Sequence, residues 1–388
     1  MTSTKTSRNA PAELQRLDLM MKLVDTSHTT PKSNSLDVRV VGVGGAGCAS
    51  VKRLQEFAPG DVQVLAIDTG SSVSNLGESI VTLQLGNGFG SGGDAAVAAE
   101  QFSDATSTVQ NFVDEADVVI VLAGLGRGTG SGISPLVAEM ARNSGALTIA
   151  AINMPFEFEG RFRNQLAARA HDRLMQSADA VITLYNDDWT GLGNAVASLS
   201  GAFEQADRNV AELVRSITST LKASSGRFET VKKSLMNAGN TLVLSGSGDG
   251  LHAGRIAVTN TFAESTSRLS GVESAVIHVE GGIGLSLGQV AEAVTALREQ
   301  IGHHAEVHVS SERQLALGKG IRVTLLLGEG SRSVENTVVP GEATPHAVAP
   351  LVATPHAATD ARELIPSISV FDAPDPIRKR GPLLLPAS

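Results

Sequence analysis

The sequence of 388 residues has one cysteine, Cys48, and no run of about 18 consecutive apolar residues. A single cysteine excludes an internal disulfide framework and a cysteine-based zinc site, and it suits the reducing cytosol. The lack of a long apolar run excludes a membrane-spanning helix, and residues 1–25 lack the charged start, apolar block and cleavage site of a signal peptide. The sequence therefore predicts a soluble cytoplasmic protein.

Basic residues are too few for general nucleic-acid binding. The chain has 31 Lys and Arg against 40 Asp and Glu, with a net charge of -9 and an isoelectric point near 5.5. Nucleic-acid binding needs clustered basic side chains that replace counterions on phosphates, so we expect no nucleic-acid partner. Small anionic ligands remain compatible with this charge, because backbone N–H groups can hold them.

The first half of the chain alternates apolar, strand-like runs with helical stretches. The runs are nearly continuous in Val, Ile and Leu, which is typical of a parallel sheet with helices on both faces. They lie at 37–44, 62–69, 79–86, 116–124, 146–154 and 178–186. We expect an α/β fold with a Rossmann-like domain at 37–200, a long central helix at 201–223 and a smaller α+β domain at 224–330.

The two ends of the chain differ in composition from this predicted core. Residues 1–36 are polar and rich in Ser and Thr, and we expect a flexible extension there. Residues 331–388 hold nine of the fourteen prolines and show no strand or helix periodicity. Such a segment buries too little apolar surface to offset its ordering entropy, so we expect a disordered linker that ends in a short tail motif.

Three glycine-rich loops follow three of the predicted strands. The first has the spacing G-x-G-x-x-G at 42–47, the second spans 86–96, and the third, "GLGRGTGSG", spans 124–132 and is expected to open a helix at Ile133. Glycine lets the backbone approach phosphate oxygens closely, and a helix N-terminus directs free N–H groups at the same charge. Because the carboxyl ends of parallel strands meet at one edge of a sheet, the loops predict a polyphosphate pocket.

A dinucleotide-binding oxidoreductase is one interpretation of this pocket. Asp68 lies 21 residues after Gly47, at the end of the second strand, where an acid that binds ribose belongs. That interpretation leaves the other two loops unexplained. A Walker A site is excluded, because the sequence contains no G-x-x-x-x-G-K-[ST].

The third loop resembles G-G-G-T-G-[ST]-G, the signature of the tubulin/FtsZ family. "VVGVGGAGCASV", "GFGSGGDAAVA", "MPFEFEGRFR" and "AFEQAD" are similar to further segments of that family and occur in its order, between residues 38 and 330. The linker and short basic tail resemble those of bacterial FtsZ. The resemblance implies the tubulin/FtsZ fold, GTP or GDP as ligand, Mg²⁺ held mainly through the phosphates, and assembly into head-to-tail filaments.

The resemblance also implies which residues bind the nucleotide. The phosphates are assigned to Gly44, Gly45, Ala46, Gly47, Gly90, Gly92, Gly93, Gly126, Arg127, Gly128, Thr129, Gly130, Ser131 and Gly132. The sugar and base are assigned to Glu159, Arg163, Asn186, Phe203 and Asp207. Phe203 would stack on guanine, and Asp207, one helical turn later, would accept hydrogen bonds from N1–H and the exocyclic amine.

The resemblance fails at the catalytic loop that the family inserts into the next subunit. The family pattern N-x-D-F-x-D-V reads "SGRFETV" here, so Ser225, Arg227 and Thr230 replace the asparagine and both aspartates. Arginine stays protonated and threonine is a weak base, so neither replaces a carboxylate. Glu229 is the remaining carboxylate, and in an extended loop it is expected to face away. No catalytic residue is therefore assigned.

These observations predict a GTP-binding, FtsZ-like filament protein of a bacterial cytoplasm, with weak or partner-dependent GTP hydrolysis and a role in cell division or a related process. Its expected partners are further copies of itself or a catalytically complete FtsZ, and a membrane adaptor at the tail. The alternatives are a competent GTPase that uses Glu229, a GTP-binding regulator that does not polymerise, and the NAD-dependent oxidoreductase.

Overall fold

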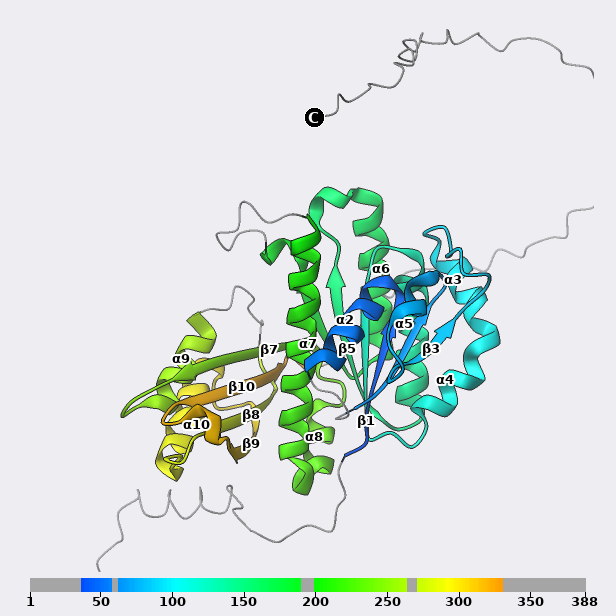
Figure 1. Cartoon of the computed structure of the whole chain (residues 1–388). Coiled ribbons are helices and arrows are strands. Elements are labelled where there is room, and N and C mark those ends of the chain that lie inside the picture. The colour runs from blue at the N-terminus through cyan, green and yellow to red at the C-terminus, as the bar shows by residue number, and fades with distance from the viewer. Residues whose placement is uncertain (1–35, 58–61, 190–198, 264–270, 331–388) are drawn as a thin grey trace, which may run out of the picture. The chain divides into compact units, whose positions relative to one another are not determined.

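The structure, a computed structural model, describes residues 36–57, 62–189, 199–263 and 271–330. Its strands form one sheet in the order β3-β2-β1-β4-β5-β6-β7-β10-β8-β9 (Figure 1). The strands are β1 (Val38–Val43), β2 (Gln63–Asp68), β3 (Val81–Gln84), β4 (Val118–Gly124), β5 (Leu147–Met154), β6 (Ala180–Tyr185), β7 (Gly239–Gly248), β8 (Ser274–Gly281), β9 (Glu306–Arg313) and β10 (Ile321–Gly328).

Helices cover both faces of this sheet. They are α2 (Gly44–Phe57), α3 (Ala95–Phe102), α4 (Thr106–Val113), α5 (Gly128–Asn143), α6 (Arg161–Ser177), α7 (Leu199–Ala223), α8 (Phe228–Leu235), α9 (Ala253–Ala263) and α10 (Leu287–Ile301). None of the helices in these ranges is long and apolar enough to cross a bilayer.

The strands from β3 to β6 are all parallel to their neighbours, as the apolar runs predicted. β1 and β4 lie in the middle and are buried almost throughout, because α2 and α7 cover one face and α3 to α6 cover the other. A strand buried on both faces needs apolar side chains at consecutive positions, which explains the Val-rich runs. The predicted α/β fold is confirmed.

The sheet continues into the second half through β7. β7 is parallel to β6 through only two register pairs, Ala180↔Gly239 and Val181↔Asn240, and antiparallel to β10 through eight. α9 and α10 cover one face of this smaller half, and α7 runs between the two halves (Figure 1). The domain limits at 200 and 224 stay a prediction. The predicted tail and all of the predicted N-terminal extension except Leu36 lie outside the described residues.

The predicted start of the helix after the third glycine loop is wrong. α5 begins at Gly128 and not at Ile133, with Arg127 as its extended N-cap residue. The glycines of this first turn allow close packing: a Cβ on Gly130 would lie 2.1 Å from the Gly124 carbonyl oxygen, and one on Gly132 would lie 2.3 Å from that of Ala95. Most of the loop "GLGRGTGSG" is therefore the start of a helix pressed against its neighbours.

Gly47 likewise allows α2 to pack closely against its neighbours. Substitution of Gly47 tests this role. A Cβ on Gly47 would lie 2.4 Å from the Leu122 carbonyl oxygen in β4. We expect Gly47→Ala to lower the free energy of unfolding by about 1–3 kcal/mol, since overpacking displaces α2. Gly226→Ala is the matched control, because a Cβ on Gly226 meets no atom within 4 Å. Equal urea midpoints for the two variants would contradict this account.

Candidate functional site

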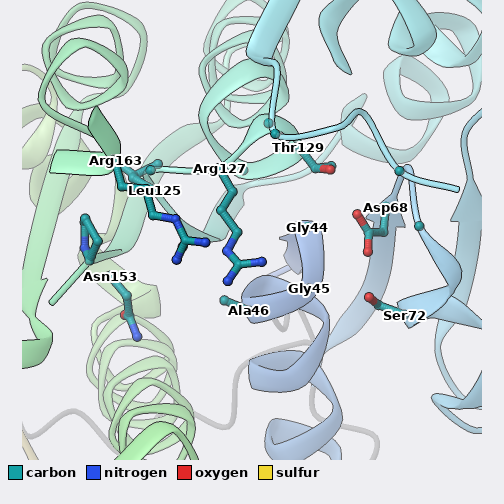
Figure 2. Close-up of a pocket in the computed structure, with 18 of the residues that line it drawn as sticks. Gly44, Gly45, Ala46, Asp68, Ser72, Leu125, Arg127, Thr129, Asn153 and Arg163 are labelled. Carbon is teal, nitrogen blue, oxygen red and sulfur yellow. The ribbon is translucent and has the colours of Figure 1, made fainter. Parts of the chain in front are cut away.

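A cavity of about 800 Å³ lies at the carboxyl ends of the parallel strands. Every residue assigned to the nucleotide from the sequence lines it, except Gly47, Ser131 and Gly132. The lining comes from the N-termini of α2 and α5 (Figure 2), the loop after β3, the segment after β5, and the first turns of α7. The fold therefore brings together residues that lie up to 163 positions apart in the sequence, from Gly44 to Asp207.

The three predicted residues outside the lining support the cavity. Gly47 and Gly132 let α2 and α5 approach β4 and α3, because a Cβ on either residue would overlap a backbone carbonyl. The Ser131 hydroxyl is buried and accepts a hydrogen bond of 2.9 Å from the Gly126 N–H. Ser131 thereby fixes the turn before α5.

Two helix N-termini lie next to each other at the cavity. A Cβ on Gly44, the first residue of α2, would lie 3.1 Å from the backbone nitrogen of Gly130 in the first turn of α5. Each N-terminus carries unpaired N–H groups and the positive end of a helix dipole. Two such ends that meet at one cavity form a site for an anion with several charged oxygens.

Arg127 lies between the turn and α5. Gly126, with φ of 93°, makes the reversal that precedes it, so Arg127 itself keeps an extended backbone with φ of −127° and ψ of 176°. Its side chain is exposed and points into the cavity toward the first turn of α2 (Figure 2). The arginine at this glycine position of the signature therefore adds a positive charge to the cavity without backbone strain.

An ion pair and the Phe203 ring form another wall of the cavity. Glu159 pairs with Arg163, one turn later, and its Oε1 also accepts the Phe156 N–H at 3.1 Å. The buried Phe156 ring stacks on Phe158 at 4.9 Å and meets Phe203 edge to face at 5.4 Å. Phe203 is held in this way and still is 41% exposed.

Two polar side chains near Phe203 can accept hydrogen bonds from a ligand. Asn186 is 5% exposed, and its Oδ1 has no hydrogen-bond partner in the described part of the chain. The Asp207 carboxylate accepts a hydrogen bond of 3.2 Å from the Ser50 hydroxyl. Burial raises the pKa of Asp207 to about 6, against the opposing effects of Ser50 and Arg53. Asp207 is therefore ionised at neutral pH and becomes neutral under mildly acidic conditions.

Sequence reasoning missed several polar residues of the lining, including Thr69, Ser72 and Asn153. The Thr69 hydroxyl bonds to that of Thr129 at 2.7 Å and so joins the end of β2 to α5. Asp68, the ribose-binding acid of the oxidoreductase interpretation, lies in this lining, and its Oδ1 accepts a hydrogen bond of 2.8 Å from the Thr69 N–H. Asp68 ends the buried strand β2 and Thr69 follows it directly, so these two residues carried a signal in the sequence. Asn153 lies within β5 and Ser72 in the turn after β2, and neither carried one.

The segment that matches the family's catalytic loop does not line the cavity. Ser225–Arg227 is a single 3₁₀ turn and α8 follows it directly, so the expected extended loop is wrong. The buried side chains Phe228, Val231 and Leu235 have helical spacing, and Glu229 and Thr230 are both exposed. Consecutive residues of a helix project about 100° apart, so Glu229 does not face away from Thr230 as it would in a strand.

The cavity and this segment lie at opposite ends of α7. Phe203 and Asp207 are near the helix start, and Ser225 lies two residues after the end of the helix at Ala223. A helix of 25 residues is roughly 37 Å long at 1.5 Å per residue. Neither Arg227 nor Thr230 therefore reaches the cavity of the same chain.

Comparison with known proteins agrees with this geometry. A cavity at the carboxyl ends of a parallel sheet, with two helix N-termini, defines the class of α/β nucleotide-binding proteins. Residues 37–194 match the family model described as "Tubulin/FtsZ family, GTPase domain". This part of the chain therefore carries the GTPase domain of the tubulin/FtsZ family, and the resemblance inferred from the motifs is confirmed.

The fold is also similar to solved structures over most of the chain. A mutant FtsZ from M. jannaschii has a TM-score of 0.68 at 24% identity, over 83% of this chain and 96% of that chain. An empty FtsZ dimer from M. jannaschii has a TM-score of 0.67 at 24% identity, over 82% and 92%. CetZ2 from Haloferax volcanii, solved as a GTPγS-bound protofilament, has a TM-score of 0.64 at 22% identity, over 77% and 95%.

The support that Ser131 gives to the cavity is testable. We expect Ser131→Ala to lower the free energy of unfolding by about 1–3 kcal/mol, because it leaves the buried Gly126 N–H without an acceptor. Ser134→Ala is the matched control on the same helix: the buried Ser134 hydroxyl only donates to the Gly130 carbonyl, so its loss leaves no N–H unpaired. A smaller loss for Ser131→Ala than for Ser134→Ala in urea unfolding would contradict this role.

Proposed function

We propose that this chain binds GTP and GDP in the cavity and assembles head to tail into filaments, with little GTP hydrolysis of its own. The observation that carries the proposal is one cavity that joins two helix N-termini to an aromatic ring and a carboxylate, Phe203 and Asp207. The N-termini suit the phosphates, and the ring and carboxylate suit a base.

The polar groups near Phe203 favour guanine over adenine as the bound base. A carboxylate accepts two hydrogen bonds from donors that point the same way, and guanine presents such a pair at N1–H and its 2-amino group. Asp207 is ionised at neutral pH, and the unpaired Oδ1 of Asn186 is a further acceptor. Glu159 and Arg163 are proposed to contact the sugar. A hydride-transferring enzyme is less well supported, because the cavity is lined by all three glycine loops.

Two observations support assembly: the cavity and the segment Ser225–Thr230 lie at opposite ends of α7, and similar structures have been solved as assemblies. Among the similar structures are an FtsZ dimer and a CetZ2 protofilament. Head-to-tail stacking would set the segment Ser225–Thr230 of one copy against the cavity of the next. Since Arg227 and Thr230 supply no carboxylate, a homopolymer should hydrolyse GTP slowly, and a catalytically complete FtsZ as partner should restore hydrolysis in this chain's cavity.

A second candidate is a competent GTPase that uses Glu229. The exposure of Glu229 beside Thr230 on α8 favours it, because both side chains are open to a neighbouring copy. The cellular role that we propose is a cytoplasmic filament of cell division or a related process, near the membrane through an adaptor that binds the tail. A regulator that binds GTP without assembling is the alternative that sedimentation tests.

The base assignment predicts a pH dependence. Only ionised Asp207 accepts both donors, so the affinity for GDP should fall as the pH decreases through about 6. We expect a loss of about tenfold between about pH 7.5 and about pH 5, measured by calorimetry. Asp207→Asn should bind about tenfold more weakly at neutral pH and should lack this part of the pH dependence.

The control for this experiment is Glu212→Gln, which removes an exposed acid from α7 that does not line the cavity and is not among the groups that shift the pKa of Asp207. It should keep the wild-type pH profile. Equal affinities for GDP and ADP, or an unchanged pH profile in Asp207→Asn, would contradict guanine recognition by this carboxylate.

The assembly proposal predicts filaments that turn over slowly. The wild-type protein should sediment with GTP and with a slowly hydrolysed analogue, and it should release little phosphate. The double variant Arg227→Asp, Thr230→Asp restores two carboxylates and should raise phosphate release by about a hundredfold. Lys233→Asp, which places a carboxylate one turn further along α8, should not.

Three other outcomes identify the alternatives. Fast phosphate release that Glu229→Ala abolishes would show that the second candidate is right. GTP binding without sedimentation would identify a regulator that does not assemble. Exchange of bound nucleotide for NAD and not for GTP would overturn the proposal.

A further inference from the structure

The charge of Arg127 is not balanced by another described side chain. Within the described ranges its guanidinium makes no hydrogen bond or ion pair, although it is exposed and lines the cavity. Arg163, the second guanidinium in Figure 2, is already paired with Glu159. Arginine keeps its proton at any working pH, so the Arg127 charge is permanent.

The surroundings of Arg127 favour an anion. Arg127 is the N-cap residue of α5 and points toward the first turn of α2, so two positive helix ends lie near its guanidinium. The carboxylates of the cavity are Asp68, Glu159 and Asp207. Glu159 is held by Arg163 and Asp207 by Ser50, so neither neutralises Arg127.

The same cavity offers little to a divalent cation. In the ranges that the structure describes, no three His, Cys, Asp or Glu side chains gather as a metal site. Asp68 is the remaining carboxylate of the lining, and its Oδ1 already accepts the Thr69 N–H. A planar guanidinium, by contrast, binds two phosphate oxygens at once. The chain itself thus carries a positive charge that can balance the negative charge of a polyphosphate.

We propose that Arg127 neutralises the polyphosphate in place of a divalent cation, so that the chain binds GTP and GDP with nearly the same affinity with and without magnesium. This inference rests on the proposed nucleotide site. It makes Arg127 a binding residue that sets the metal dependence of the site.

The test is titration of the full-length, nucleotide-free protein with fluorescent GTP and GDP analogues, in excess EDTA and in millimolar magnesium chloride. The wild-type affinity should change less than about threefold between the two conditions. Arg127→Gln should bind about ten- to a hundredfold more weakly in EDTA and should recover most of the loss in magnesium. Unchanged thermal unfolding of the variant shows that it is folded.

Arg169→Gln is the matched control, because it removes an exposed arginine from α6 that does not line the cavity. It should behave as the wild type does. A large loss of wild-type affinity in EDTA, or equal affinities of wild type and Arg127→Gln in EDTA, would overturn the inference. A magnesium dependence of the wild type that Asp68→Asn removes would assign the charge to a metal ion at Asp68. Binding of neither nucleotide under any condition would instead refute the proposed function.

Discussion

The close approach of α2 and α5 to the end of β4 is the constraint on which the cavity depends. The backbones meet where a single Cβ would overlap a carbonyl oxygen, at Gly47 against Leu122 and at Gly130 against Gly124. This contact brings the N-termini of both helices to one place, and their unpaired N–H groups then face the same volume. The glycines of the two loops thus determine the electrostatics of the cavity by allowing the packing beneath it.

α7 connects the end of the cavity that is proposed to bind the base to the segment that is proposed to contact the next copy. Its first turns carry the aromatic ring and the carboxylate of the cavity, and its last residue leads directly to the turn before α8. Its buried face packs into the core of the parallel half through Val210, Val214 and Ile217. A helix fixed along its length in this way sets the spacing between the two ends, which suits a filament whose neighbouring cavities must repeat at a constant distance.

Much of the fold could be predicted because the parallel sheet imposes continuous apolar runs, and each run became a strand. The start of α5 was missed since glycines normally indicate a loop, and only the packing against Gly124 explains a helical turn there. α8 could have been found, because Phe228, Val231 and Leu235 have helical spacing. Ser72 and Asn153 could not be placed in the site, because the order β2-β1-β4-β5 that brings them near each other depends on tertiary pairing.

The junction between β6 and β7 is the narrowest backbone connection along the sheet. Two register pairs connect these strands, whereas β7 and β10 share eight, so little backbone pairing holds one half to the other along the sheet. Local opening begins where the fewest interactions are lost. The junction is therefore the weakest backbone connection along the sheet, and amide protons at Gly239 and Asn240 should exchange before those at the centre of β4.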